Sequence, residues 1–234
     1  MDENIKTARI VGILFITATV AYSLGVILLD PILGASDYLT IASGNENQMM
    51  IGSLLVLIDA VAVAGIGIMI YPILKKHSES LALGYAGARI AEGVLFIVNV
   101  IAILTLLALS QDFVKAGSPD ASYYQTFGTI LLAAGDLAFL FGFAVAFTIS
   151  ALILNYLLYR SNLVPRWLSG WGFAGAALLW VYYLLQPFNI DLLGILFIPI
   201  AVQEMVFAVW LIVKGFNPSA IDPSTAKTDV NEIK

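Results

Sequence analysis

Five ionisable side chains lie inside stretches of sequence that are otherwise apolar enough to be lipid-soluble helices. They are Asp59, Arg89, Glu92, Asp136 and Glu204. A charge at the centre of a bilayer costs at least about 2.5–3.5 kcal/mol on insertion scales, so such residues usually face a partner, a cavity or a substrate path. Carboxyl and guanidinium groups in such a place can carry a proton, bind a cation or bind a polar small molecule. These residues are therefore the first candidates for a functional site.

A polar stripe runs along the apolar stretch that carries Arg89 and Glu92. At 100° per residue its members fall on one helical face within about 80°; they are Tyr85, Arg89, Glu92, Phe96 and Asn99. Arg89 and Glu92 are three residues apart, so a direct i,i+3 ion pair is sterically available. Asn99 joins the candidates because it extends the same stripe.

Three of the acids are predicted to lie at a common depth. At 1.5 Å of rise per residue, Asp59 and Glu204 lie about 15–18 Å from the outer ends of their spans and Glu92 about 16 Å from the inner end of its span, so all three are close to the midplane of the bilayer. We expect these three acids to line one internal pocket, with Arg89 and Asn99 on its wall. The candidate ligand- or ion-binding residues are then Asp59, Arg89, Glu92, Asn99, Asp136, Gln203 and Glu204.

Two interpretations of these residues stay open. In the first, Arg89 pairs with Glu92 and Glu204 in a buried network that fixes the register of the helices and has no other role. In the second, the residues line a cavity that handles a proton or a cation. The count of charges favours the second, because one arginine cannot neutralise four acids. Surplus acids must then be protonated, hydrated or bound to a cation, since a carboxylate is strongly disfavoured away from water.

The composition is that of a membrane protein. Of the 234 residues, 60% are apolar and 12% are charged, and the mean hydropathy is +0.94, whereas soluble domains are about 45–50% apolar and about 25% charged. The net charge is −5 without a basic stripe, so we expect no nucleic-acid partner. Cysteine is absent and His77 is the one histidine, so we expect no metal site and no cofactor.

Six apolar stretches are long enough to cross the bilayer, which requires about 20 residues each. The sequence therefore predicts an all-α, polytopic integral membrane bundle with six transmembrane helices. We expect a single transmembrane bundle over residues 1–216 and a disordered cytoplasmic tail over residues 217–234, with a short helix in the loop from Asp30 to Gln48. The predicted spans are Ala8–Leu29, Met49–Leu74, Leu81–Leu109, Phe127–Tyr159, Trp167–Leu185 and Leu192–Val213.

The lysines and arginines predict the orientation. By the positive-inside rule both termini are cytoplasmic in the cell membrane, because nine basic residues fall on one side of a six-span arrangement and Lys115 alone falls on the other. The nine are Lys6, Arg9, Lys75, Lys76, Arg160, Arg166, Lys214, Lys227 and Lys234.

Several strings in the chain together resemble one family. They include Tyr71-Pro72-Ile73-Leu74-Lys75-Lys76-His77, Leu81-Ala82-Leu83-Gly84-Tyr85 with Arg89 and Glu92, Tyr159-Arg160-Ser161-Asn162-Leu163-Val164-Pro165-Arg166-Trp167 and Trp210-Leu211-Ile212-Val213-Lys214-Gly215-Phe216. The chain is similar in these strings to the prokaryotic membrane family catalogued as domain of unknown function 4386. The resemblance implies a six-helix membrane protein of a bacterium or archaeon. It implies no activity and no catalytic residues.

Three functions are compatible with the sequence. The first is a protein that binds or transports a small molecule, a proton or a cation through the midplane acids; six spans are few for a monomeric transporter, so this function predicts a homodimer. The second is an intramembrane lipid-modifying enzyme in which Glu92 and Asp59 act as general acid and base. The third is a non-catalytic membrane subunit or sensor with a structural ion-pair network. The partner common to all three is the lipid bilayer.

Overall fold

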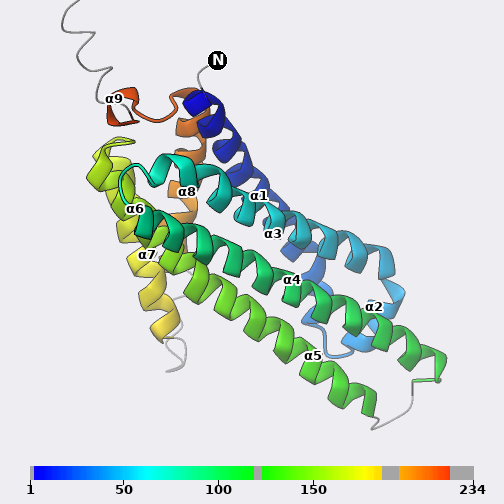
Figure 1. Ribbon diagram of the computed structural model, residues 1–234. Coiled ribbons are helices and arrows are strands. Elements are labelled where there is room, and N and C mark those ends of the chain that lie inside the picture. Colours follow the sequence, from blue (N-terminus) through cyan, green and yellow to red (C-terminus); the bar gives the residue numbers. More distant parts are fainter. Residues whose placement is uncertain (1–2, 119–122, 186–194, 222–234) are drawn as a thin grey trace, which may run out of the picture. The chain divides into compact units, whose positions relative to one another are not determined.

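A computed structural model describes residues 3–118, 123–185 and 195–221, and every regular element in these ranges is a helix (Figure 1). The elements are α1 (Glu3–Leu33), α2 (Tyr38–Gly44), α3 (Glu46–Leu74), α4 (Glu79–Lys115), α5 (Tyr123–Leu140), the π-helix η1 (Phe141–Phe147), α6 (Thr148–Ser161), α7 (Arg166–Leu185), the short 3₁₀-helix η3 (Ile195–Phe197), α8 (Ile198–Val213) and α9 (Pro218–Ile221).

Six helical segments are long and apolar enough to span a membrane, which confirms the predicted fold class and number of spans. Two of them are nearly twice as long as the about 20 residues that the roughly 30 Å hydrocarbon core requires. These are α4 with 37 residues and the continuous segment Tyr123–Ser161 with 39 residues. The second contains η1, and its i→i+5 hydrogen bonding is a local widening of the helix that is frequent at functional sites.

The loop between the first two spans contains the predicted short helix, α2. Leu39 and Ala42 of α2 are buried, so one face of this helix packs against the protein. Two side chains fix the segment that follows: Asn45 donates to the carbonyl of Ile41 over 2.8 Å, and Gln48 donates to the carbonyl of Leu28 over 2.8 Å. The loop is thereby tied to the end of α1.

A tight turn joins α6 to α7 and fixes where the two helices meet. Asn162 follows the last residue of α6 with φ of 54°, in the left-handed region, which asparagine tolerates better than most residues. Pro165 then precedes the first residue of α7, and its ring fixes φ at a value suited to entering a helix. This turn explains why the Asn162-to-Arg166 string occurs at a boundary between two apolar stretches.

The contacts of the chain group into two compact units that alternate along the sequence. Unit 1 comprises the described residues within 1–16, 64–90 and 144–234, and unit 2 comprises those within 17–63 and 91–143. We expected a single bundle from the sequence. Each unit has its own apolar core.

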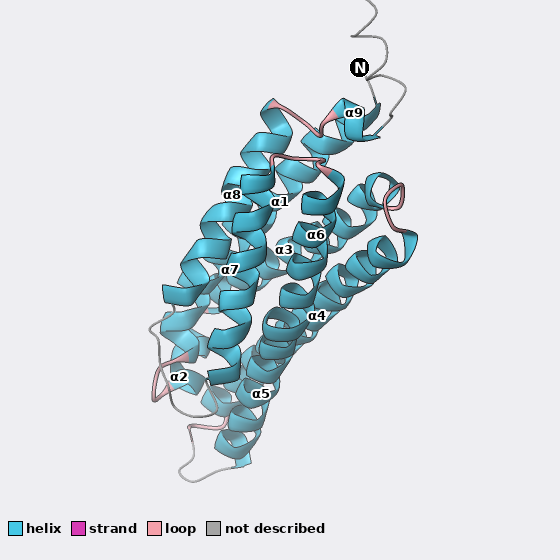
Figure 2. Cartoon of the chain, turned by 90° about the vertical axis from the view of Figure 1, so that its left-hand side faces the viewer, coloured by secondary structure: helices cyan, strands magenta, loops and turns pink. Residues whose placement is uncertain are grey.

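The core of unit 1 is built from the beginning of α1, the end of α3, the beginning of α4 and the helices α6 to α8 (Figure 2). The rings of Phe15 and Phe207 meet edge to face at its centre, 5.5 Å apart. The four tryptophans of the protein all belong to this unit, three on α7 and one on α8. Trp167 contacts both Trp171 and Trp210, with ring centroids 6.5 and 6.4 Å apart.

A stack of aromatic rings packs against the mainly aliphatic core of unit 2. Tyr22 of α1, Phe96 of α4 and Phe139 of α5 lie with their ring centroids 5.7–6.0 Å apart and their planes within 17° of one another. Phe143 of η1 continues the stack, 5.6 Å from Phe139. Offset stacking of this kind adds roughly 0.5–1.5 kcal/mol per pair beyond the burial of the rings.

The segment 217–234, which we expected to be a disordered tail, begins with ordered structure. The backbone N–H of Asn217 donates to the carbonyl of Leu163 over 2.8 Å, and Ile221 at the end of α9 is buried in the core of unit 1. Residues 222–234 lie outside the described residues.

Candidate functional site

A small polar cavity lies inside unit 1, surrounded by residues of α1, α4, α6 and α8. The space open to the centre of a water molecule is about 10 Å³, which is about what one water molecule needs. The lining consists of Phe15, Tyr85, Arg89, Ser150, Ala151, Leu154, Asn155, Gln203, Glu204 and Phe207. Seven of these come from α6 and α8, and the charges come from α4 and α8.

Arg89 brings a permanent positive charge to this cavity, because a guanidinium does not lose its proton in proteins. Its side chain is 3% exposed. The guanidinium carbon lies 5.6 Å from the ring centre of Phe15 and 5.7 Å from that of Phe147. Such cation–π contacts contribute about 2 kcal/mol each when water is excluded. Gly67 of α3 allows this packing, because a Cβ there would come within 2.9 Å of the Arg89 Cβ.

Glu204 brings the carboxyl group. It is the middle residue of the 19-residue helical stretch Ile195–Val213, so it lies about 14 Å from either end. Arg89 lies about 15 Å along α4 from its first residue, Glu79. The end of α8 and the beginning of α4 contribute to one core cluster, so the two groups lie at matched depth.

Two amide side chains complete the polar lining. The Gln203 amide donates to the Asn155 Oδ1 atom over 3.4 Å and to the Leu168 carbonyl over 3.2 Å. An amide group has two N–H hydrogens, so these bonds use both and fix the orientation of the side chain. The Asn155 amide in turn donates to the Ala151 carbonyl over 2.9 Å. The chain of bonds links α6, α7 and α8 beside the cavity.

Gly172 of α7 makes this link sterically possible. A Cβ at position 172 would overlap the side-chain amide of Asn155. The buried amide needs partners, since an unsatisfied polar group inside a protein costs about 1–3 kcal/mol. A glycine at this position therefore lets α7 approach α6 closely enough for Asn155 to reach Gln203.

The seven residues singled out by the sequence divide between the two units. Arg89, Gln203 and Glu204 lie together in unit 1 on the cavity. The other four belong to unit 2 and do not line this cavity; they are Asp59, Glu92, Asn99 and Asp136. Of the acids singled out by the sequence, the cavity within unit 1 is lined by Glu204.

The residues of unit 2 occupy different surroundings from one another. Asp59 and Glu92 are 3% and 2% exposed within α3 and α4. Asn99 donates to the carbonyl of Gly135 over 3.0 Å, which ties α4 to α5. Asp136 is the next residue along α5, and its side chain is exposed. The carboxyl of Asp136 is therefore placed on a different face of α5 from the Gly135 contact.

Sequence reasoning missed Asn155 and Ser150, which also line the cavity. The signal for Asn155 was available, because an amide inside an apolar span is costly and usually faces the protein interior. Ser150 gave no such signal: its hydroxyl donates to the Phe147 carbonyl over 2.8 Å on its own helix, and serines with this local bond are common in helices.

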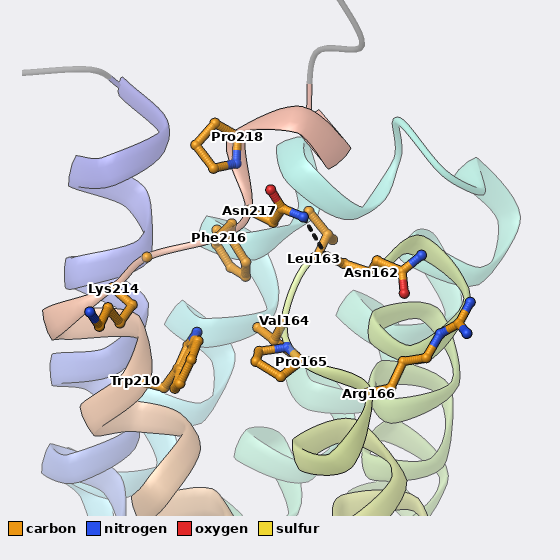
Figure 3. A pocket seen from close by; sticks show the side chains of 11 residues that line it. Asn162, Leu163, Val164, Pro165, Arg166, Trp210, Lys214, Phe216, Asn217 and Pro218 are labelled. Atoms are coloured by element: carbon orange, nitrogen blue, oxygen red, sulfur yellow. Dashed lines mark hydrogen bonds between the residues drawn. The ribbon is translucent and has the colours of Figure 1, made fainter. Parts of the chain in front are cut away.

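A larger hollow of about 330 Å³ lies at the junction of α6, α7 and α8 (Figure 3). Asn217 donates to the Asn162 carbonyl over 3.3 Å across its upper side. Trp210, Pro165 and Phe216 surround it, while Lys214 and Arg166 stand on opposite flanks and point away from each other. The walls of this hollow are thus largely apolar, and its two cationic side chains do not point toward a common site.

Comparison with known proteins gives one match. The family described as a domain of unknown function (DUF4386) matches residues 10–215. No curated protein and no solved structure matches the chain.

Proposed function

Since the chain belongs to the family described as domain of unknown function 4386, which carries no activity to transfer, we propose a function from the cavity itself. The protein binds a proton or a small cation at Glu204 and uses this site for transport across the cell membrane. It is a multi-pass membrane protein with six helices long and apolar enough to span the bilayer.

The observation that carries this proposal is the convergence of Arg89, Gln203 and Glu204 on one cavity in the middle of a membrane span. A carboxyl group at such a depth is expensive, so it is retained where it does something that an apolar residue cannot do. Arg89 supports a charged Glu204 when the site is empty, and a proton or cation can compete with Arg89 for the carboxylate. That competition gives the site two states.

The size of the cavity limits the kinds of ligand that it can hold. A volume of about 10 Å³ has room for one water molecule, whereas pockets for organic ligands measure about 300–1,000 Å³. The lining also holds one carboxyl group, whereas hydrolysis by carboxylates alone uses one as an acid and a second as base or nucleophile. Both facts favour a proton or a small cation over a lipid substrate.

Asp59 and Glu92 extend the proposal to unit 2. Both are buried acids within apolar helices, so the same argument from desolvation applies to them. We include them, with Asn99 and Asp136, as candidate stations for the transported ion. The proton-uptake measurement that tests Glu204, described next, also tests the contribution of these residues.

The test is proton uptake by liposomes that contain the purified full chain and a pH-sensitive dye, driven by a potassium diffusion potential. We expect Glu204→Gln to reduce uptake to the rate of protein-free liposomes, since an amide does not ionise. Asp112→Asn is the matched control, because Asp112 is an exposed acid paired with Lys115 at 3.5 Å. Repeating the assay with sodium inside or outside separates proton from cation transport.

The proposal fails if the wild-type protein raises neither proton nor sodium flux, or if Glu204→Gln and Asp112→Asn behave alike. A folded Glu204→Gln protein with normal flux would leave Arg89 and Glu204 as a structural pair, which is the role of a non-catalytic subunit. Circular dichroism of each variant shows that the comparison is made between folded proteins.

We also propose that both termini face the cytoplasm, as the distribution of lysine and arginine predicts. Cysteines introduced at Ser36 and at Ser78 test the orientation, since the protein has no cysteine of its own. An impermeant thiol reagent added to intact cells should label position 36 and not position 78. The reverse pattern would invert the orientation.

A further inference from the structure

A second polar hollow in unit 1 lies where α3 ends, α4 begins and α6 ends, segments that are far apart in the sequence and adjacent in space (Figure 1). It encloses about 330 Å³. The lining consists of His77, Ser78, Leu81, Tyr156, Leu157, Arg160 and Ser161. The Glu204 cavity does not account for this hollow, because no lining residue is shared between them.

The lining is basic and carries no carboxyl group. Arg160 contributes the charge, and its Nη1 atom donates to the Tyr156 hydroxyl over 3.0 Å. The guanidinium carbon also lies 5.9 Å from the centre of the Tyr156 ring. These two contacts hold the guanidinium against α6. Since a guanidinium has five N–H donors, the bond to Tyr156 uses one of them.

The Ser78 hydroxyl, just before α4, supplies a further donor from a different part of the chain than Arg160. Its Oγ atom accepts a hydrogen bond from the Leu81 N–H over 3.5 Å, and a hydroxyl that accepts through its oxygen still has its own hydrogen to donate. The Ser161 hydroxyl already donates to the Leu158 carbonyl over 3.4 Å and accepts from the Leu163 N–H over 3.3 Å. The hollow therefore combines a cation, an imidazole and one hydroxyl donor.

We propose that this hollow binds the phosphate group of a phosphate ester. A guanidinium presents paired N–H donors whose spacing matches two phosphate oxygens, and the Ser78 hydroxyl and an imidazole can serve the remaining oxygens. The absence of a carboxyl group from the lining makes a metal cation a poor fit. The ester is the headgroup of an anionic phospholipid or a soluble organic phosphate, and helix ends at the headgroup level of a bilayer are accessible to both.

The size of the hollow supports an ester over a bare phosphate ion. Ligand pockets of about 300–1,000 Å³ enclose molecules larger than a single tetrahedral anion. Leu81 and Leu157 provide an apolar part of the wall, which suits the carbon atoms of an esterified group. A glycerophosphate group combines both kinds of surface.

His77 makes binding dependent on pH. Partial burial and the nearby charge of Lys76 lower the pKa of His77 below its ordinary value of 6.5, so the imidazole of the empty hollow is neutral near neutral pH. The charged groups around it are Lys76 on its own turn, Arg160 on α6 and Glu79 at the start of α4. A bound phosphate favours the imidazolium, so binding takes up a proton and tightens as the pH falls from about 7.5 to about 6.

The experiment uses the full chain in phosphatidylcholine nanodiscs. Glycerol 3-phosphate is titrated by calorimetry, and retention of phosphatidylglycerol over phosphatidylcholine is measured by native mass spectrometry. Arg160→Gln should weaken binding about tenfold, because hydrogen bonds to a charged partner commonly contribute at least that factor. Arg166→Gln is the matched control: Arg166 also lies over a tyrosine ring, 5.5 Å from that of Tyr159, but outside this hollow, so its effect should stay within about twofold.

The outcomes separate the sources of the ligand. Binding of glycerol 3-phosphate identifies a soluble ester, and selective retention of phosphatidylglycerol identifies a lipid headgroup; either supports the proposal. His77→Gln should still bind and lose the part of the pH dependence that the imidazole causes, while the part caused by the second ionisation of the phosphate ester, near pH 6, remains. The proposal is overturned if neither probe binds, or if Arg160→Gln and Arg166→Gln weaken binding equally, which would indicate attraction to a basic surface alone.

Discussion

The two units accommodate polar side chains within apolar helices in different ways. In unit 1 the amides of Asn155 and Gln203 bond to each other beside a cavity that also receives Arg89 and Glu204. In unit 2 the rings of Tyr22, Phe96, Phe139 and Phe143 stack through the core. The Asn99 side chain there bonds to the carbonyl of Gly135, a backbone group, rather than to another side chain.

The difference teaches that the position of a polar residue along a span does not decide its role. Glu204 and Asp59 are both acids inside apolar helices, and Glu204 lines the cavity of unit 1 while Asp59 belongs to unit 2. The neighbours across the helix decide, because amides, guanidinium groups and small residues leave room for a polar site around Glu204. Each unit can be tested by disturbing its own type of contact.

The largest effect is expected from Arg89→Leu. Removing the guanidinium takes away its contacts with the rings of Phe15 and Phe147, which contribute about 2 kcal/mol each when water is excluded, and leaves Glu204 without the cation that shares its cavity. The double variant Arg89→Leu with Glu204→Gln should be more stable than the single variant, because the remaining charge is gone. Thermal unfolding in detergent measures both. A double variant no more stable than Arg89→Leu would show that the two residues do not act as a pair.

A smaller loss is expected from Gly172→Ala. The added methyl group overlaps Asn155, and overpacking of this kind costs about 1–3 kcal/mol. Gly87→Ala is the matched control, since nothing lies within 4 Å of a Cβ at that position and alanine is favoured over glycine in helices by up to about 1 kcal/mol. The two alanines should therefore shift the unfolding midpoint in opposite directions. A shift in the same direction would contradict the close approach of α6 and α7.

In unit 2 we expect Phe139→Leu to cost about 1.5 kcal/mol, the low end for the three stacking contacts that it removes at about 0.5–1.5 kcal/mol per pair. Phe141→Leu two residues along is the control, since Phe141 is exposed and outside the stack. The free energy of unfolding in mixed detergent micelles measures both. Equal effects would mean that the rings act by size alone.

The smallest effect concerns pH and His77. Its pKa is lowered in the folded state by burial and by Lys76, so the unfolded chain takes up a proton first as the pH falls below about 6.5. Folding stability in phosphate-free buffer should therefore decrease slightly from pH 7 toward lower pH, and His77→Gln should remove that part of the decrease. Melting curves of both proteins at several pH values measure these changes in stability. If the folding stability of His77→Gln depends on pH as that of the wild-type protein does, other groups cause the loss of stability.

The fold was largely predictable from the sequence. Hydropathy and length identify six helices to within a few residues, because membrane spans need long apolar runs and internal backbone hydrogen bonding. The helix in the first loop was predicted from the length of that loop. The division into two units was not, since it depends on which faces of shared long helices pack together, and the helices are apolar on all sides.

The candidate site was predictable in part. Arg89, Gln203 and Glu204 were found because charged and amide groups are rare in apolar spans. Matched depth did not show which acids share a cavity, because depth leaves the direction of a side chain around its helix undetermined. Asp136 illustrates this, since it is exposed on α5 beside the buried Gly135. The part played by Gly172 depends on contacts with another helix and has no signature in one sequence.

The confinement of all four tryptophans to α7 and α8 has an optical consequence. Fluorescence excited selectively in indole reports on unit 1 alone, because no tryptophan occurs in the sequence of unit 2. The native protein thus carries a built-in probe of one unit without any label. Whether unit 1 melts together with the rest of the protein can be read by comparing this emission with the loss of helix by circular dichroism in a single heated sample.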